Sequence, residues 1–203
     1  FRVAPGGAQE IYGVTPDLTT FAKVVAGGLP GGALAGRADL MEAIAFDNRY
    51  GRKMKHPGTY NANPLSAAAG IAMLRHVATG EPCWKATEAA VALRRGLNEL
   101  FRDAGVNWVA YGEFSLTHVL PEYDGPPPAS DDFVPYDGDF ARIDRPIDRR
   151  VAHAFRCAAL LGGVDCMGMG MITSAAHAEA VIERSLAGFA AAIDRLKAEG
   201  VMR

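Results

Sequence analysis

Glycines crowd the first 80 residues of this 203-residue chain and separate short apolar runs from one another. Because glycine permits tight turns and ends regular elements, this texture predicts short strands and helices stacked in α/β layers. The densest stretch, residues 27–32, follows the apolar run 21–25, which Lys23 interrupts. We therefore expect a short buried strand within residues 14–25 that ends near Lys23, and a second strand over residues 33–36.

An asparagine followed by a proline marks the clearest helix start in the chain. Asn63 can accept hydrogen bonds from the first free amides, and Pro64 has the φ angle of a first helical residue. The alanine-rich sequence behind them predicts a helix that begins at Pro64. Apolar residues at helical spacing predict a long amphipathic helix over residues 81–104, ended by Gly105.

The remaining elements alternate between helices and strands. We expect a short helix over residues 39–46, one or two strands over 106–120, a helix over 147–161, a glycine-broken strand pair over 164–174 and a terminal helix over 177–198. The length allows one large domain or two small ones.

Residues 121–146 differ in character from the rest of the chain. Seven acidic side chains face only Arg142 and Arg145, and the segment contains three consecutive prolines. Such a composition predicts a long irregular loop. The loop is either a solvated excursion or a lid over an active site.

The overall composition narrows the class of protein. Twenty-one basic and 23 acidic residues give a formal net charge of -2, so no broad positive field favours nucleic acid or an anionic membrane. The sequence has no apolar run of membrane-spanning length and no secretory signal pattern. Three widely spaced cysteines fit a reducing compartment, so we expect a cytoplasmic protein. Because the chain opens at Phe1 and not at methionine, we expect a fragment or a processed product.

Lys23 is an unusual residue to find at the end of an apolar run. Burial disfavours the ammonium form, which lowers the pKa of a lysine and supplies the neutral amine that Schiff-base chemistry needs. The glycines at 27–32 would let a cofactor approach the backbone. On spacing alone the stronger interpretation is a lysine at a strand edge whose amine reaches water.

Residues 57–64 form a polar loop that leads into the capped helix. Free amides at a helix start, joined by the Thr59 hydroxyl, can bind a phosphate. The alternative is that Asn63 only caps the helix and Thr59 only closes a turn. The sequence has no hydrolase serine elbow, zinc-binding helix, phosphate-loop lysine or dinucleotide fingerprint, and its five histidines lack metal-ligand spacing. We expect no metal site.

Two of these segments resemble one family. Residues 13–33, GVTPDLTTFAKVVAGGLPGGA, resemble the lysine segment of the class III aminotransferases, which depend on pyridoxal 5'-phosphate. Residues 58–65, GTYNANPL, resemble the segment that follows it in that family. The two motifs stand in the family's order and at about its separation. Residues 163–177 resemble the family's C-terminal domain more loosely, and within the family the nearest likeness is to the aminomutases.

The resemblance implies a fold, a cofactor and site residues. The fold is that of a fold-type I α/β transferase, with residues 1–80 from the C-terminal part of the cofactor-binding large domain and residues 81–203 forming an α+β small domain. Lys23 would form a Schiff base with pyridoxal 5'-phosphate and move a proton at the substrate. Gly58 and Thr59 would bind the phosphate of the cofactor held by a neighbouring subunit, which implies a homodimer with shared active sites. Its substrates would be a small amino donor and a keto or aldehyde acceptor.

Two departures from the family pattern keep alternatives open. In this family an acidic residue pairs with the pyridine nitrogen of the cofactor. That residue lies upstream of a stretch that Phe1 and Arg2 resemble, so the resemblance places it before residue 1. We thus expect the C-terminal part of a larger enzyme, and a non-catalytic remnant or a phosphate-ligand binder stays possible. Met169 stands where the aminomutases carry a glutamate, which favours intermolecular transamination over an intramolecular amino shift.

Overall fold

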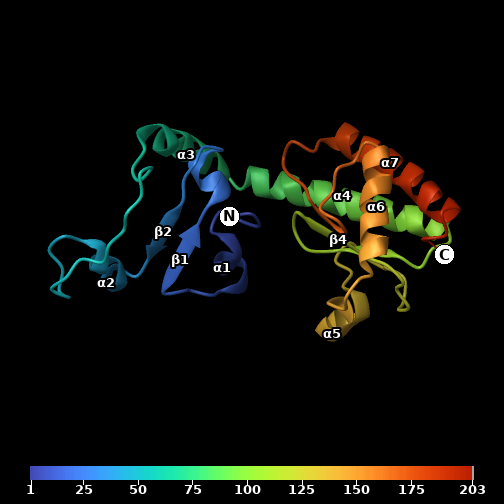
Figure 1. The fold of residues 1–203 in the computed structure, drawn as a ribbon, viewed down its shortest axis with the longest axis horizontal. Coiled ribbons are helices and arrows are strands. Elements are labelled where there is room, and N and C mark those ends of the chain that lie inside the picture. Colours follow the sequence, from blue (N-terminus) through green and yellow to red (C-terminus); the bar gives the residue numbers. More distant parts are fainter. Residues whose placement is uncertain (203) are drawn as a thin grey trace. The chain divides into compact units, whose positions relative to one another are not determined.

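The computed structural model describes residues 1–202 and divides into two compact units (Figure 1). The first unit is Phe1–Pro82, and the second begins at Cys83. None of the helices among residues 1–202 combines the length and the apolar content that crossing a lipid bilayer requires.

The first unit consists of short helices around a two-stranded sheet. Its elements are α1 (Gly7–Tyr12), β1 (Leu18–Phe21), η1 (Lys23–Ala26), β2 (Ala33–Gly36), α2 (Ala38–Met41), η2 (Glu42–Ile44) and α3 (Pro64–Val77). The strands β1 and β2 pair antiparallel, with Leu18 opposite Gly36. The strand expected over residues 33–36 is confirmed. The helix expected over residues 39–46 is present as α2 followed by the 3-10 turn η2.

The strand expected within residues 14–25 is present as β1 and ends close to Lys23, but it is not buried as expected. Strand β1 ends at Phe21, and its residues alternate between exposed and half-buried. All four residues of β2 are exposed. The physical reason is that this sheet has only two strands within residues 1–202, so no second layer covers its faces.

Helix α3 begins where the sequence predicts. The side-chain oxygen of Asn63 accepts hydrogen bonds from the amides of Leu65 (3.0 Å) and Ser66 (3.1 Å), and Pro64 is the first helical residue. The cap satisfies two amides that a helix otherwise leaves without partners, which fixes the start of α3.

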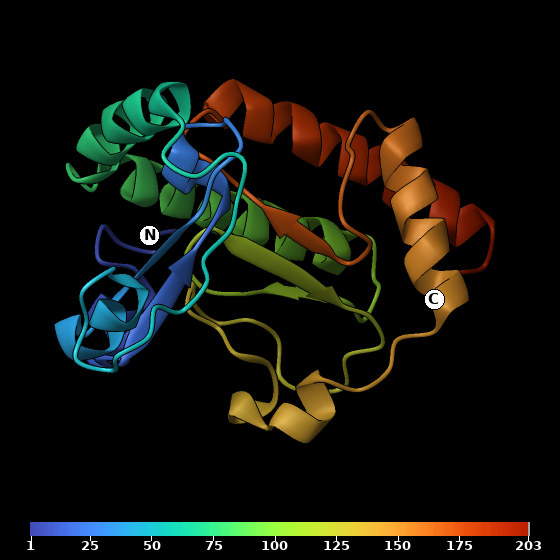
Figure 2. The same ribbon diagram turned by 60° about the vertical axis from the view of Figure 1, so that its left-hand side comes forward.

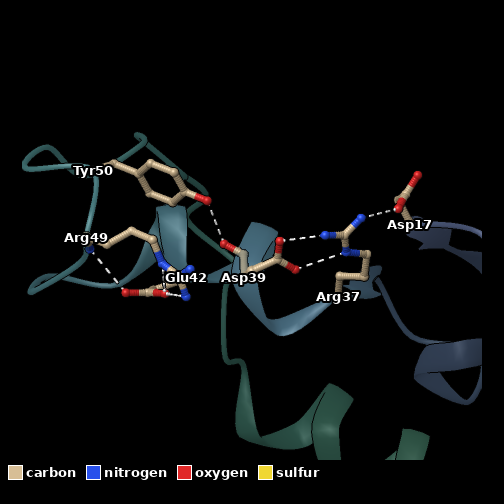
Figure 3. A network of polar contacts seen from close by, with 6 residues as sticks. All are labelled: Asp17, Arg37, Asp39, Glu42, Arg49 and Tyr50. Carbon is tan, nitrogen blue, oxygen red and sulfur yellow. Dashed lines mark hydrogen bonds and ion pairs between the residues drawn. The ribbon is translucent and has the colours of Figure 1, made fainter.

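Charged residues join α2 and η2 to the sheet. Arg37 donates two hydrogen bonds to the carboxylate of Asp39, at 3.0 and 2.7 Å, and one to Asp17 at 2.8 Å (Figure 3). Arg49 binds Glu42 in the same way, through Nε at 2.6 Å. The Arg37 guanidinium lowers the pKa of Asp39, and Arg49 lowers the pKa of Glu42. Asp17 and both arginines are exposed, and Asp39 and Glu42 are only half-buried, so each pair stabilises the unit only modestly.

The second unit packs three long helices beside a three-stranded antiparallel sheet. Its elements are α4 (Glu81–Asp103), β3 (Val109–Tyr111), β4 (Leu116–Leu120), η3 (Pro135–Gly138), α5 (Phe140–Ile143), α6 (Arg149–Leu161), β5 (Gly170–Ile172) and α7 (Glu179–Ala198). The strand order is β3-β4-β5, and α4, α6 and α7 lie together next to the sheet (Figure 2). The expected helices over 81–104, 147–161 and 177–198 are confirmed within three residues at each end.

A row of aromatic rings forms the centre of this unit. Phe101, Trp108, Phe155 and Phe189 follow one another with ring centroids 5.8 to 6.1 Å apart. All four are buried, with at most 4% of their surface exposed. Because they come from α4, α6, α7 and the chain next to β3, their burial holds the helices and sheet together.

Two expectations for the second unit need correction. The strand pair expected over residues 164–174 is one strand, β5, preceded by an isolated bridge between Met167 and Gly170. Gly168, with φ +63°, turns the chain too tightly between them for a second strand to extend.

The acidic segment 121–146 is largely irregular, as the sequence predicts, but part of it packs against the core instead of extending into solvent. It contains η3 and α5, and the ring of Tyr123 packs against Phe133 and Tyr136 at 5.8 and 4.8 Å. The same side chains contact Leu120 of β4. Aromatic packing therefore holds part of a segment whose charges and prolines suggested a solvated excursion.

Replacing Arg37 tests the ion-pair network. A carboxylate with a lowered pKa in the folded state contributes stability above its unfolded pKa, and loses it as the pH falls through the folded value. We expect Arg37→Gln to raise the pKa of Asp39 towards its ordinary value of 3.8. This pKa is measured by NMR titration of the Asp39 side-chain carboxyl carbon. Arg52→Gln, an exposed arginine outside the network, is the matched control. An unchanged Asp39 titration in Arg37→Gln would contradict this assignment.

Candidate functional site

Lys23 occupies a strained backbone position. Its φ angle is +57°, in the left-handed region that non-glycine residues rarely adopt, and it begins the 3-10 helix η1. Such a conformation costs of order 1–3 kcal/mol and persists only where the surroundings enforce it. The Lys23 side chain is exposed, which fits the interpretation of an edge lysine whose amine reaches water and not that of a buried amine.

Two glycines bring the Lys23 segment directly onto α3. A Cβ added at Gly70 would lie 2.6 Å from the carbonyl oxygen of Val25, and one added at Gly27 would lie 2.5 Å from that of Ala69. Both distances are far shorter than side chains tolerate, so only glycine permits this approach. Gly27 also has φ +63° and closes η1. The backbone that enforces the conformation of Lys23 is therefore held by α3.

The loop before α3 is a compact turn. The amide of Asn61 donates to the carbonyl of Gly58 (3.0 Å), and its side chain donates to the carbonyl of His56 (3.1 Å). A side chain at Gly58 would collide with the Asn61 carboxamide, and Ala62 has φ +56°. Within residues 1–202, neither the amide nor the hydroxyl of Thr59 has a hydrogen-bond partner. Thr59 thus offers two free donors at an exposed turn.

The loop and the glycine-rich segment enclose one cavity of about 810 Å³. Gly58 and Thr59 line it from the loop, Ala26 and Gly31 from the segment after Lys23, and Ser66 from α3. The Ser66 hydroxyl donates to the carbonyl of Pro30 at 2.8 Å, which ties the glycine-rich segment to the helix. The structure therefore brings Gly58 and Thr59 together with the glycine run. Lys23 does not line this cavity.

The chemistry of the cavity suits an anion. The two donors of Thr59 stand next to the start of α3, where the helix dipole favours negative charge. Among residues 1–202, no carboxylate lines the cavity to compete with an anionic ligand. Those residues also contain no group of three or more His, Cys, Asp or Glu side chains that could hold a metal ion.

Some residues that shape the site escaped the sequence analysis. Gly70 was not singled out, although a glycine inside an alanine-rich helix is a signal of close backbone approach. Ser66 gives no comparable signal, because its partner Pro30 is 36 residues away.

Comparisons with known proteins agree on one family. Residues 6–109 match the family model described as aminotransferase class-III. A protein of Pyrobaculum islandicum named glutamate-1-semialdehyde 2,1-aminomutase is 35% identical over 202 residues, which cover 98% of this chain and 44% of that protein. The crystal structure of an omega-transaminase from Sphaerobacter thermophilus has a TM-score of 0.77 and 28% identity, covering 97% of this chain and 42% of that one.

A transaminase structure with pyridoxal phosphate bound is similar to the same extent. Its TM-score is 0.76 at 27% identity, and the match covers 98% of this chain and 43% of that chain. This chain therefore spans less than half the length of the proteins it matches. The similarity to the transaminase structures confirms the expected fold-type I α/β architecture.

Replacing Gly70 tests the contact between η1 and α3. We expect Gly70→Ala to displace η1, because the new methyl group meets the Val25 carbonyl. Amide hydrogen exchange at Gly27, whose N–H donates to Val24 at 2.9 Å, should then become faster by about tenfold or more.

The matched control is Ala72→Gly, which weakens α3 by about 1 kcal/mol through helix propensity at an exposed position. If both variants accelerate exchange at Gly27 equally, helix loosening explains the effect and the close contact does not.

Proposed function

This chain belongs to the class III aminotransferase family, and from that membership we propose that the protein carrying it transfers amino groups between small molecules. The cofactor of this family is pyridoxal 5'-phosphate, as in the similar transaminase solved with it bound. The observation that carries the proposal is that the family match spans both Lys23, at its strained turn, and the free donors of Thr59.

The residues of the first unit suit the cofactor. The Thr59 hydroxyl and amide can donate to phosphate oxygens, and the Gly58 turn leaves the backbone open to them. The exposed amine of Lys23 can attach to an aldehyde carbon through Nζ. When bound, pyridoxal phosphate supplies the electron sink that stabilises negative charge at the substrate α-carbon. The Nζ of Lys23 would then move the proton at that carbon.

We infer that Lys23 and Thr59 of one chain serve two different active sites. Thr59 lines the 810 Å³ cavity with both donors free, whereas Lys23 of the same chain lies outside its lining. A Thr59 that completes the site of a second subunit accounts for this separation. The proposal thus includes a homodimer with shared active sites.

Two reactions fit this machinery. Intermolecular transamination is the first, because the similar structures with more than 25% identity are transaminases. Met169, at the position where the sequence analysis expected an aminomutase glutamate, packs its apolar side chain against the core of the second unit. An aminomutase that shifts an amino group within one molecule is the second, favoured by the name of the Pyrobaculum islandicum relative.

The cysteines bear on the compartment in which the protein works. Cys83, Cys157 and Cys166 form no disulfide within residues 1–202, and Cys83 and Cys166 are buried. Free thiols persist in a reducing environment, so we propose a cytoplasmic location.

Reductive labelling tests the role of Lys23. When the polypeptide that carries these residues is mixed with pyridoxal phosphate and reduced with borohydride, we expect the pyridoxyl group on Lys23, because its amine stands at the family's lysine position. Peptide mass spectrometry locates the label. Lys55→Ala, which removes another exposed lysine of the same unit, should keep the label on Lys23, and Lys23→Ala should lose it. Label spread evenly over the lysines would overturn the assignment.

Mixing two variants tests the shared sites. We expect Thr59→Val to weaken cofactor binding by about tenfold, since it removes a hydrogen bond to a charged group. Heterodimers of Lys23→Ala and Thr59→Val chains contain one site with both native residues if Thr59 serves the partner. The amount of tightly and covalently bound cofactor should therefore increase when the two variants are unfolded, mixed and refolded together. No increase over the separately refolded variants would mean that both residues serve one site.

A further inference from the structure

A second cavity, of about 300 Å³, is formed within the second unit, and none of its lining residues belongs to the candidate site described above. It opens between the C-terminal half of α4 and the acidic segment. Its walls combine three arginines of α4 with apolar and aromatic side chains: Arg94, Arg95, Arg102, Tyr111, Pro128 and Phe133. Such a mixture of cations and apolar surface is typical of sites for small organic anions.

Arg94 is the unusual member of this group. Only 5% of its surface is exposed, yet within residues 1–202 no carboxylate forms an ion pair with it. Its Nη1 donates to the carbonyl oxygens of Phe114 (3.2 Å) and Leu116 (2.6 Å). Its Nε is buried and has no hydrogen-bond partner. A buried cation with an unused donor is costly unless something neutralises it.

The two carboxylates that line the cavity, Glu99 and Asp131, do not supply that partner. Glu99 forms no ion pair with Arg94 in the described part of the chain and acts on Arg95 through space. Asp131 is already bound by Arg95, through Nε at 3.1 Å and Nη2 at 2.6 Å, and it acts on Arg94 only through space. Arg102 pairs with its own neighbour Asp103 at 3.0 Å, outside the cavity lining. Burial lowers the pKa of Arg94, which reflects the same missing partner.

We propose that this cavity binds a small organic carboxylate, with the Arg94 guanidinium as the group that recognises its charge. A planar guanidinium matches a carboxylate in geometry as well as in charge. The carboxylate would supply the counter-ion that Arg94 lacks, while its apolar part would lie against Phe133 and Pro128. Asp131, which lines the cavity and is bound by Arg95, is a competing internal carboxylate.

A purely structural role for Arg94 explains less. Holding the backbone after Phe114 uses Nη1 alone and needs no charge at all. It leaves the buried Nε without a partner and the positive charge without a counter-ion. A carboxylate in the cavity supplies the counter-ion that the two backbone contacts do not.

A titration of the 203-residue chain with benzoate tests the proposal. Binding is monitored by NMR through the signal of the Arg94 Nε–H group. We expect a saturable shift of that signal, identified by its loss in Arg94→Lys. Benzamide has the same ring without the charge, and should bind at least about tenfold more weakly. Equal shifts with the two compounds, or no shift with benzoate, would overturn the proposal.

A second variant keeps the test decisive if Arg94→Lys fails to fold. Asp131→Asn leaves Arg94 intact and removes the competing carboxylate, so benzoate should bind about threefold more tightly. Asp165→Asn makes the same change in charge outside the cavity, where Asp165 pairs with Arg156 at 3.5 Å, and should leave the affinity unchanged. Equal effects of the two substitutions would contradict recognition in this cavity.

Discussion

The close contact between η1 and α3 is the constraint on which the candidate site depends. Gly27 and Gly70 let two backbones meet at distances that any side chain would prevent. Helix α3 in turn has a fixed start, because Asn63 caps it. Helix α3 therefore positions both segments. The turn that carries Lys23 packs against its side, and the loop that carries Thr59 leads into its N-terminus.

The second unit is stabilised by different means. Its centre is a continuous row of aromatic rings contributed by three helices and the chain beside the sheet, so burial of apolar surface dominates. The acidic segment then adds a separate aromatic cluster around Tyr123 and an ion pair to α4. This packing makes the segment one wall of the arginine-lined cavity, which buried Arg94 also lines.

Local signals predicted the fold better than they predicted the environment of single side chains. The cap at Asn63 and the spacing of α4 act within a few residues, and both elements form where the sequence indicates. Burial of β1 depends on a covering layer that residues 1–202 do not provide, so the apolar run before Lys23 predicted a burial that the strand does not have. The pair of Arg95 and Asp131 joins residues 36 apart, and no short pattern signals it. The roles of Lys23, Gly58 and Thr59 stay predictions that the site geometry supports.

The most direct measurement of the central claim is a crystal structure, with pyridoxal phosphate, of the polypeptide that carries these residues. The account predicts continuous electron density between the cofactor and Nζ of Lys23. It also predicts that the phosphate contacts Thr59 of the other subunit of a dimer. Cofactor attached to a different lysine, or phosphate bound away from Thr59 in both subunits, would contradict the account.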